Sequence, residues 1–168
     1  MHKTKILFLF AFFCIGASHA SSSNSCQENP LSCLISKSTR TEAPDHSLQK
    51  NVLQRSLGLC STEPLTGYFR NGYCQTDSTD GGVHTVCAEM TDDFLIYSKS
   101  LGNDLITPHS DVGFPGLKAG QRWCLCAARW KEANLAGHAP GVILSATHQK
   151  TLDSLDLLTL QKAKITKP

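Results

Sequence analysis

The sequence predicts an α+β fold: a small single domain of short mixed or antiparallel strands with two to four short helices. The length of 168 residues fits one domain plus appendages. The composition changes near residue 51, from a polar, Ser-rich stretch to segments with regular apolar spacing. After that point short strand patterns alternate with short helix patterns, which is typical of one domain that mixes both elements.

Residues 1–20 have the three parts of an export signal. MHKTK is a basic start, ILFLFAFFCIGA is an apolar run, and SHA supplies small residues before a cleavage point after Ala20. A membrane anchor is the alternative, but this run is shorter than the ~20 residues that a spanning helix needs. We therefore expect a secreted or periplasmic protein with no transmembrane segment once the signal is cleaved.

Two regions follow the signal. Residues 21–50 are polar and Ser-rich and predict a flexible arm, in which Cys26 and Cys33 are candidates for a local disulfide. Residues 51–168 are predicted to form the globular domain. At its start, YFRNGYCQ (68–75) predicts a β-hairpin, because Asn71-Gly72 tolerates the positive φ angles of a tight type I′ turn.

The central segments predict a strand and then a helix. VHTVCAEM (83–90) has the alternation of a strand, with Val86, Ala88 and Met90 on one face and Cys87 on the other. Thr91 follows as the N-cap of a helix whose first turn is acidic, which favours the positive end of the helix dipole. The glycine at 102 predicts the end of this helix.

The second half of the domain repeats this alternation. A long loop with a turn at Pro115-Gly116 precedes QRWCLC (121–126), a short strand, and AARWKEANLA (127–136), a helix that ends at Gly137. GVILSA (141–146) predicts a short buried strand. A helical tail rich in leucine completes the domain.

The charge balance excludes one class of partner. With Lys3 and Lys5 removed in the signal, 14 basic residues face 14 acidic ones in the mature chain. A nucleic-acid-binding protein normally shows a basic excess concentrated on one face. We therefore expect no nucleic-acid partner, and the sequence names no other partner or substrate.

The cysteines are the unusual feature. Seven remain after signal removal, and in an oxidising compartment they predict a disulfide framework with one cysteine left over. Five lie in the domain and are candidate structural thiols: Cys60, Cys74, Cys87, Cys124 and Cys126. On a strand, Cys124 and Cys126 point to the same face with parallel side chains, so each is expected to meet a cysteine of a neighbouring strand. Cys74 and Cys87 are the natural candidates.

Two other chemistries use the same residues. Zinc is a candidate cofactor, with the ligand set His84, Cys87, Cys124 and Cys126, although Cys-x-Cys is less common than the spacing of most structural zinc sites. Cys126 is also a candidate nucleophile, because the helix start predicted there lowers a thiol's pKa. Its base would be one of three histidines: His84, His138 or His148. Asp104 is a candidate acid or metal ligand, and turn chemistry is the plainer explanation for it.

Several long pieces match a known family. These pieces are CSTEPLTGYFRNGYC (60–74), HTVCAEMTDDFL (84–95), GNDLITP (102–108), GFPGLKAGQRWCLCAARWKEA (113–133) and ATH (146–148). In this order, over about residues 51–162, the chain resembles the bacterial domain of unknown function 2237. The resemblance implies a compact single domain and no established activity. It also implies that relatives without an export signal keep these thiols reduced, which favours a metal or thiol role in them.

Three hypotheses of function follow. The first is a small exported globular protein with a structural thiol cluster, either disulfides or a zinc site. The second is a cysteine- or metal-dependent enzyme of unknown substrate, which would use Cys126 or a metal-bound water with His84 and Asp104. The third is a binding module that presents the 106–120 loop and the tryptophans Trp123 and Trp130, although core packing is the commoner role of such tryptophans.

Overall fold

A computed structural model describes residues 43–165 of the chain. Within this range a three-stranded antiparallel sheet has the order β2-β1-β3, and three α-helices accompany it. The strands are β1 (Val86–Glu89), β2 (Arg122–Leu125) and β3 (Gly141–Val142), and the helices are α2 (Asp92–Ser100), α3 (Ala127–Ala136) and α4 (Leu157–Lys162). The predicted α+β class is confirmed.

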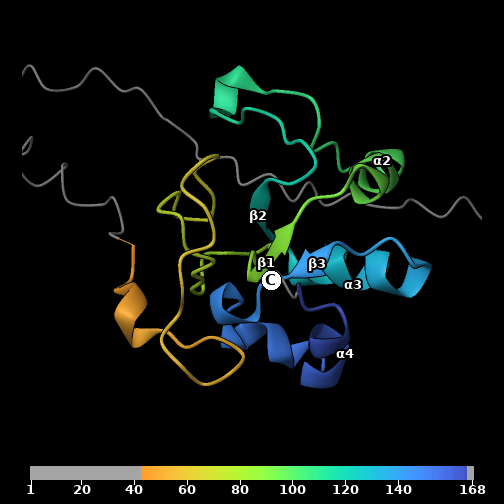
Figure 1. Cartoon of the computed structure of the whole chain (residues 1–168). Helices are drawn as coiled ribbons and strands as arrows, with labels where there is room; N and C mark the ends of the chain where they lie inside the picture. Colours follow the sequence, from red (N-terminus) through yellow and green to blue (C-terminus); the bar gives the residue numbers. More distant parts are fainter. Residues whose placement is uncertain (1–42, 166–168) are drawn as a thin grey trace, which may run out of the picture.

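The sheet separates two different cores. Val86, Ala88 and Met90 lie on one face of β1 and join the large apolar cluster. Cys87 lies on the opposite face, in a second cluster with other cysteines. This is the division that the alternating pattern predicts. In Figure 1 the three helices gather on one side of the sheet, and the segment from residue 43 to about 80 lies on the other.

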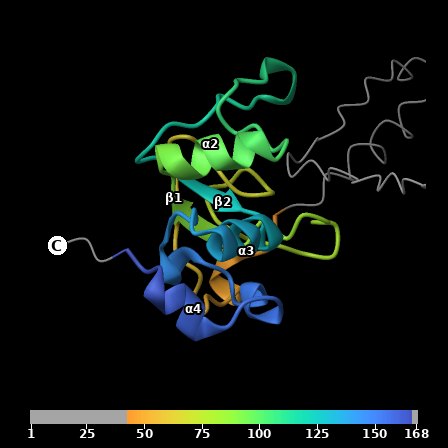
Figure 2. The ribbon, with the colours of Figure 1, turned by 90° about the vertical axis from the view of Figure 1, so that its right-hand side faces the viewer.

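The ends of α2 and α3 follow the capping rules. The Thr91 hydroxyl accepts a hydrogen bond from the Phe94 N–H at the start of α2. Gly137 has a left-handed φ of 82° and ends α3, as expected for a C-terminal glycine. Trp130 of α3 is fully buried and donates its indole N–H to the Pro140 carbonyl oxygen. Figure 2 shows α2 above the sheet and α4 below it.

The last part of the domain is less regular than predicted. The expected strand at 141–146 is only two residues long and passes directly into a 3₁₀ helix, Leu144–Ala146. The helical tail is likewise divided into a 3₁₀ helix, Gln149–Asp153, and α4. Thr147 lies between the two 3₁₀ helices, and its hydroxyl donates to the Ile143 carbonyl.

The predicted hairpin at 68–75 is wrong. A type I′ turn needs positive φ at both Asn71 and Gly72, and here the positive angles fall at Arg70 and Gly72. The Gly72 carbonyl instead accepts the N–H groups of Cys60 and Ser61, and its own N–H donates to the Thr66 carbonyl. The backbone of Gly72 therefore pairs with the chain before it and not across a hairpin.

The last residues of the predicted arm are part of the described structure. They include a 3₁₀ helix at His46–Leu48, before the domain start expected at 51. The Gln49 side chain donates to the Thr76 carbonyl, so this end of the predicted arm contacts the domain. The signal, most of the arm and the candidate Cys26–Cys33 disulfide lie outside the described residues. No helix between residues 43 and 165 is long and apolar enough to cross a membrane.

Candidate functional site: a cysteine cluster and an aspartate–histidine pair

The cysteine cluster is built on the paired strands β1 and β2. Cys87 and Cys124 are direct partners in the antiparallel register. Their side chains therefore leave the sheet on the same face, where cross-strand neighbours stand closest. The loop before β1 supplies Cys60 and Cys74, and all four side chains are nearly or fully buried. Ala146 and Ile143 complete the apolar surroundings.

The four cysteines form two disulfides. Cys60 is bonded to Cys87 and Cys74 to Cys124, with S–S lengths of 2.00 and 2.06 Å. The meeting of Cys124 with Cys74 agrees with the sequence prediction, whereas Cys87 takes Cys60 as its partner. The sulfur atoms of Cys60, Cys74 and Cys87 all lie within 4.8 Å of one another. The two disulfides are therefore neighbours in one compact sulfur cluster.

Cys126 has a separate position. It is the N-cap residue of α3, it is buried, and it is disulfide-bonded, though to none of the four cysteines above. The helix start that favours a thiolate is thus present, as the sequence predicts. A sulfur in a disulfide is not a thiolate, however, so in this state Cys126 lacks the nucleophile that the enzyme hypothesis gave it.

The predicted zinc ligand set is divided in the same way. Cys87 and Cys124 are adjacent but each sulfur is bonded to another cysteine. His84 has its Nδ1 atom 2.6 Å from a carboxylate oxygen of Asp80. In the disulfide form the three predicted cysteine ligands therefore offer no thiolate to a metal.

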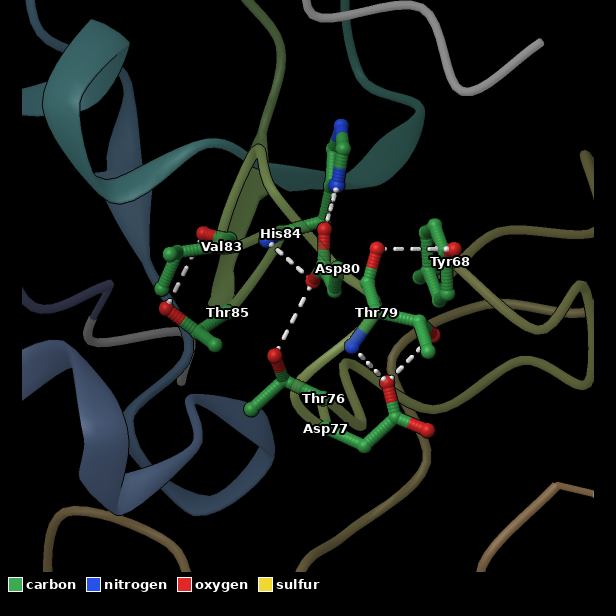
Figure 3. A network of polar contacts seen from close by, with 8 residues as sticks. All are labelled: Tyr68, Thr76, Asp77, Thr79, Asp80, Val83, His84 and Thr85. Atoms are coloured by element: carbon green, nitrogen blue, oxygen red, sulfur yellow. Dashed lines mark hydrogen bonds and ion pairs between the residues drawn. The ribbon is translucent and has the colours of Figure 1, made fainter.

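His84 belongs to a buried pair that the sequence reasoning missed (Figure 3). Its side chain is 11% exposed and that of Asp80 is fully buried. One carboxylate oxygen of Asp80 faces His84 Nδ1, and the other accepts the backbone N–H of His84 at 2.8 Å. A carboxylate beside Nδ1 orients the ring and favours a proton on that nitrogen. The only sequence signal was an aspartate four residues before the histidine.

Three neighbours fix this pair. The Thr76 hydroxyl donates to Asp80 at 3.1 Å, and the ring of Tyr68 stacks on His84 with centroids 6.1 Å apart. The Tyr68 hydroxyl in turn donates to the Thr79 carbonyl (Figure 3). Burial alone would raise the pKa of Asp80, but the hydrogen bonds and charge of His84 together with the Thr76 bond outweigh it, so this pKa is lowered. Asp80 is therefore an ionised carboxylate at neutral pH.

Asp104 has a local role. Its carboxylate accepts the N–H groups of Ile106 and Thr107 and lies 2.9 Å from the Lys99 ammonium. Burial opposes its ionisation, but hydrogen bonds from Thr107, Lys99 and Ile106 dominate and hold the pKa of Asp104 well below its usual range. These contacts are those of the turn that the plainer explanation predicts.

Both tryptophans belong to the core. Trp123 is 7% exposed and Trp130 is 0% exposed, so the tryptophans are not part of a surface offered to a partner. The Arg70 guanidinium lies over the Trp123 ring, 4.8 Å from its centroid. Desolvation by burial lowers the pKa of Arg70. The binding-module hypothesis is left with the 106–120 loop alone.

The sheet, the covering helices and the paired disulfides define a small disulfide-bonded α+β protein. Residues 50–164 match the family described as "Uncharacterized protein conserved in bacteria (DUF2237)". This match covers most of the chain, which belongs to that family, and the resemblance seen in the sequence is confirmed. No curated protein matches the chain.

Proposed function

We propose that this chain is a small exported globular protein whose cysteine cluster is structural and works as a pair of disulfides. One observation carries the proposal. The two disulfides join the loop segment before β1 to the two central strands, at Cys87 and Cys124. Between residues 51 and 85 the chain forms no helix and no strand of the sheet, so these links replace regular hydrogen bonding there.

The compartment follows from the same chemistry. Disulfides persist in secreted and periplasmic proteins and are reduced in the cytosol. The basic start, apolar run and small residues of positions 1–20 have the pattern of an export signal. Both features support export with cleavage after Ala20.

The test is a mass analysis of the protein expressed with its own N-terminus. We expect a mature chain that begins at Ser21 and is found outside the cytoplasm. Digestion without reductant should give linked peptides for Cys60–Cys87 and for Cys74–Cys124, and these four cysteines should resist alkylation in denaturant until a reductant is added. A chain that keeps residues 1–20, or alkylation of the four cysteines without reductant, would contradict the proposal.

A second candidate function is acid–base catalysis by His84, and the buried Asp80 contact favours it. The predicted catalytic residues are Cys126, His84 and Asp104. Among them His84 is the one that is buried beside an ionised carboxylate, that of Asp80. An imidazole oriented in this way can serve as a general base, in which Asp80 positions the ring and stabilises the protonated state. The substrate class is open.

A matched control exists for this second candidate. His138 also contacts a carboxylate, Asp93, at 2.9 Å and stacks on a tyrosine, Tyr97, but its side chain is 38% exposed. The wild type should be screened against ester, amide and phosphoester substrates. Any turnover found should fall by roughly 100-fold or more in His84→Gln and stay within about twofold in His138→Gln. Turnover that a folded His84→Gln retains would exclude His84 as the base.

A further inference from the structure

The sulfur cluster brings three cysteine sulfurs close to the spacing of a metal site. Four thiolates around zinc at about 2.3 Å stand about 3.8 Å from one another in a tetrahedron. The sulfurs of Cys60, Cys74 and Cys87 already lie within 4.8 Å of one another. The fourth sulfur, of Cys124, is bonded to that of Cys74 and lies outside this group, so it has to move toward the sulfurs of Cys60 and Cys87 once the disulfide opens.

We propose that the reduced chain binds one divalent cation that prefers sulfur ligands, such as zinc. Its ligands are Cys60, Cys74, Cys87 and Cys124. This set differs from the ligands that the sequence predicts, because it includes neither His84 nor Cys126. The inference rests on the proposed structural role of the same four cysteines. In the oxidised chain the disulfides hold the strands and loop together, and in the reduced chain the metal takes over that task.

The strands and the loop keep the ligands together after reduction. Cys87 and Cys124 remain opposite each other through the β1–β2 pairing. Their N–H groups donate to the hydroxyls of Thr147 and Thr66, which fix these two strand positions independently of sulfur. The Cys60 N–H donates to the Gly72 carbonyl, two residues before Cys74, so the two loop cysteines also stay close.

The chemistry balances with a phosphine as the reductant. Each S–S bond is broken by two electrons from phosphorus, water supplies the oxygen of the phosphine oxide, and its two hydrogens end on the two thiols. Binding of the cation then forms four metal–sulfur bonds and releases the thiol protons, so uptake is favoured as pH rises. The cation offsets half of the charge of the four thiolates in their apolar surroundings.

Cobalt(II) is a suitable probe because tetrahedral sulfur coordination gives it intense charge-transfer and visible bands. The mature chain is reduced with a phosphine under nitrogen and titrated with cobalt(II). We expect one cobalt per chain, displacement by zinc, and recovery of the far-ultraviolet circular dichroism of the oxidised protein. The oxidised chain should bind none.

Variants assign the ligands. The double variant Cys60→Ser/Cys87→Ser should weaken cobalt binding by more than the roughly 10–100-fold that loss of an outer-sphere partner costs. Cys126→Ser removes a domain cysteine outside the cluster and should leave the spectrum unchanged. Failure of the reduced wild type to bind cobalt, folded or unfolded, overturns the inference, and so does tetrahedral binding that persists in the double variant. Peptide mapping of the unreduced chain tests the disulfides separately, so failure of the metal site and failure of the scaffold are distinguishable.

Discussion

At the scale of single residues, the position of the His84 ring depends on a glycine beside it. A Cβ atom added at Gly82 would lie 2.4 Å from His84 Cε1, far inside contact distance. The ring has little freedom to move away, because Asp80 holds its Nδ1 atom at 2.6 Å. The adjacent Gly81 is different: a Cβ there would meet nothing within 4 Å. Substitution by alanine should therefore disturb the structure at Gly82 and be tolerated at Gly81.

Gly82→Ala should displace the imidazole and break its contact with the buried Asp80 carboxylate. We expect a loss of about 1–3 kcal/mol in the free energy of unfolding, the cost of leaving a buried polar group without its partner. Gly81→Ala should stay within about 0.5 kcal/mol of wild type. Urea denaturation measures both values, and equal effects of the two substitutions would show that the ring is not fixed as described.

His148 predicts a pH dependence of stability. Its Nδ1 atom accepts the Lys150 N–H as the cap of a 3₁₀ helix, which requires an unprotonated nitrogen. Desolvation by burial, with a smaller contribution from the Lys150 charge, lowers the pKa of His148. The unfolded chain then binds a proton more readily than the folded one, so this contribution to stability is present above about pH 6.5 and is lost as pH falls below it.

His148→Asn keeps a capping acceptor and removes the titration. The difference in unfolding free energy between wild type and this variant should shrink, or reverse, as the pH falls from about 7.5 to about 5.5. Denaturant unfolding at several pH values gives that difference. A difference that is independent of pH would mean that His148 has the same pKa in both states.

At the scale of the elements, two threonine hydroxyls complete the hydrogen bonding of the cysteine strands. Cys87 N–H donates to Thr147 where β3 has already ended, and Cys124 N–H donates to Thr66 at the outer edge of β2. Both threonines are 0% exposed, so no water can replace them without a structural change. Each hydroxyl therefore accepts a strand N–H that would otherwise bond to a carbonyl of a neighbouring strand.

Thr66→Val removes the acceptor while it keeps the volume of the side chain. The buried Cys124 N–H is then unpaired, and we expect a loss of about 1–3 kcal/mol in the free energy of unfolding. Thr66→Ser keeps the hydroxyl and should recover most of that loss. Thermal or urea unfolding measures the stability of the two variants. Equal stability of Thr66→Val and wild type would contradict the role of the hydroxyl.

The same elements show why local patterns succeeded in one half of the domain and failed in the other. The strand around Cys87 and the helix after Thr91 were predictable because alternation and capping are properties of neighbouring residues. The segment at Asn71-Gly72 had an equally good local signal for a hairpin. Its conformation is decided by partners far along the chain, since Cys74 is bonded to Cys124, 50 residues away.

Part of the candidate site was also predictable from local patterns, and part was not. The sequence identified the cysteines, and the period of two residues placed Cys87 on the face opposite Val86 and Ala88. The shared strand face predicted for Cys124 and Cys126 is not seen, because the strand ends at Leu125 and Cys126 caps α3. Disulfide connectivity does not follow from sequence, because each bond is set by distances across the fold. Asp80 was missed for a related reason: it lies in a loop, where a spacing of four residues to His84 predicts no shared face.

At the scale of the whole molecule, the two disulfides form crossed links. Cys60–Cys87 spans 27 residues and Cys74–Cys124 spans 50. The second bond starts at Cys74, inside the loop that the first bond closes, and ends at Cys124, beyond that loop. Loop-closure entropy assigns about 3.5 and about 4 kcal/mol to loops of these lengths. A small domain typically has only about 5–15 kcal/mol of net stability, so either bond is a large share of it.

The last prediction concerns the removal of each disulfide separately. The double variants Cys60→Ala/Cys87→Ala and Cys74→Ala/Cys124→Ala should each lose about 2–5 kcal/mol in the free energy of unfolding, and the two losses should differ by less than about 1 kcal/mol on loop length alone. Guanidinium unfolding of the oxidised proteins, with equal slopes as the check on two-state behaviour, measures both losses.

Because the bonds cross, the chain with one bond left still has its loop segment attached to one strand of the sheet. It should therefore unfold in a single transition at lower denaturant. A loss below about 1 kcal/mol in either variant would mean that this disulfide is not part of the scaffold, and the corresponding cysteine pair would then need another role.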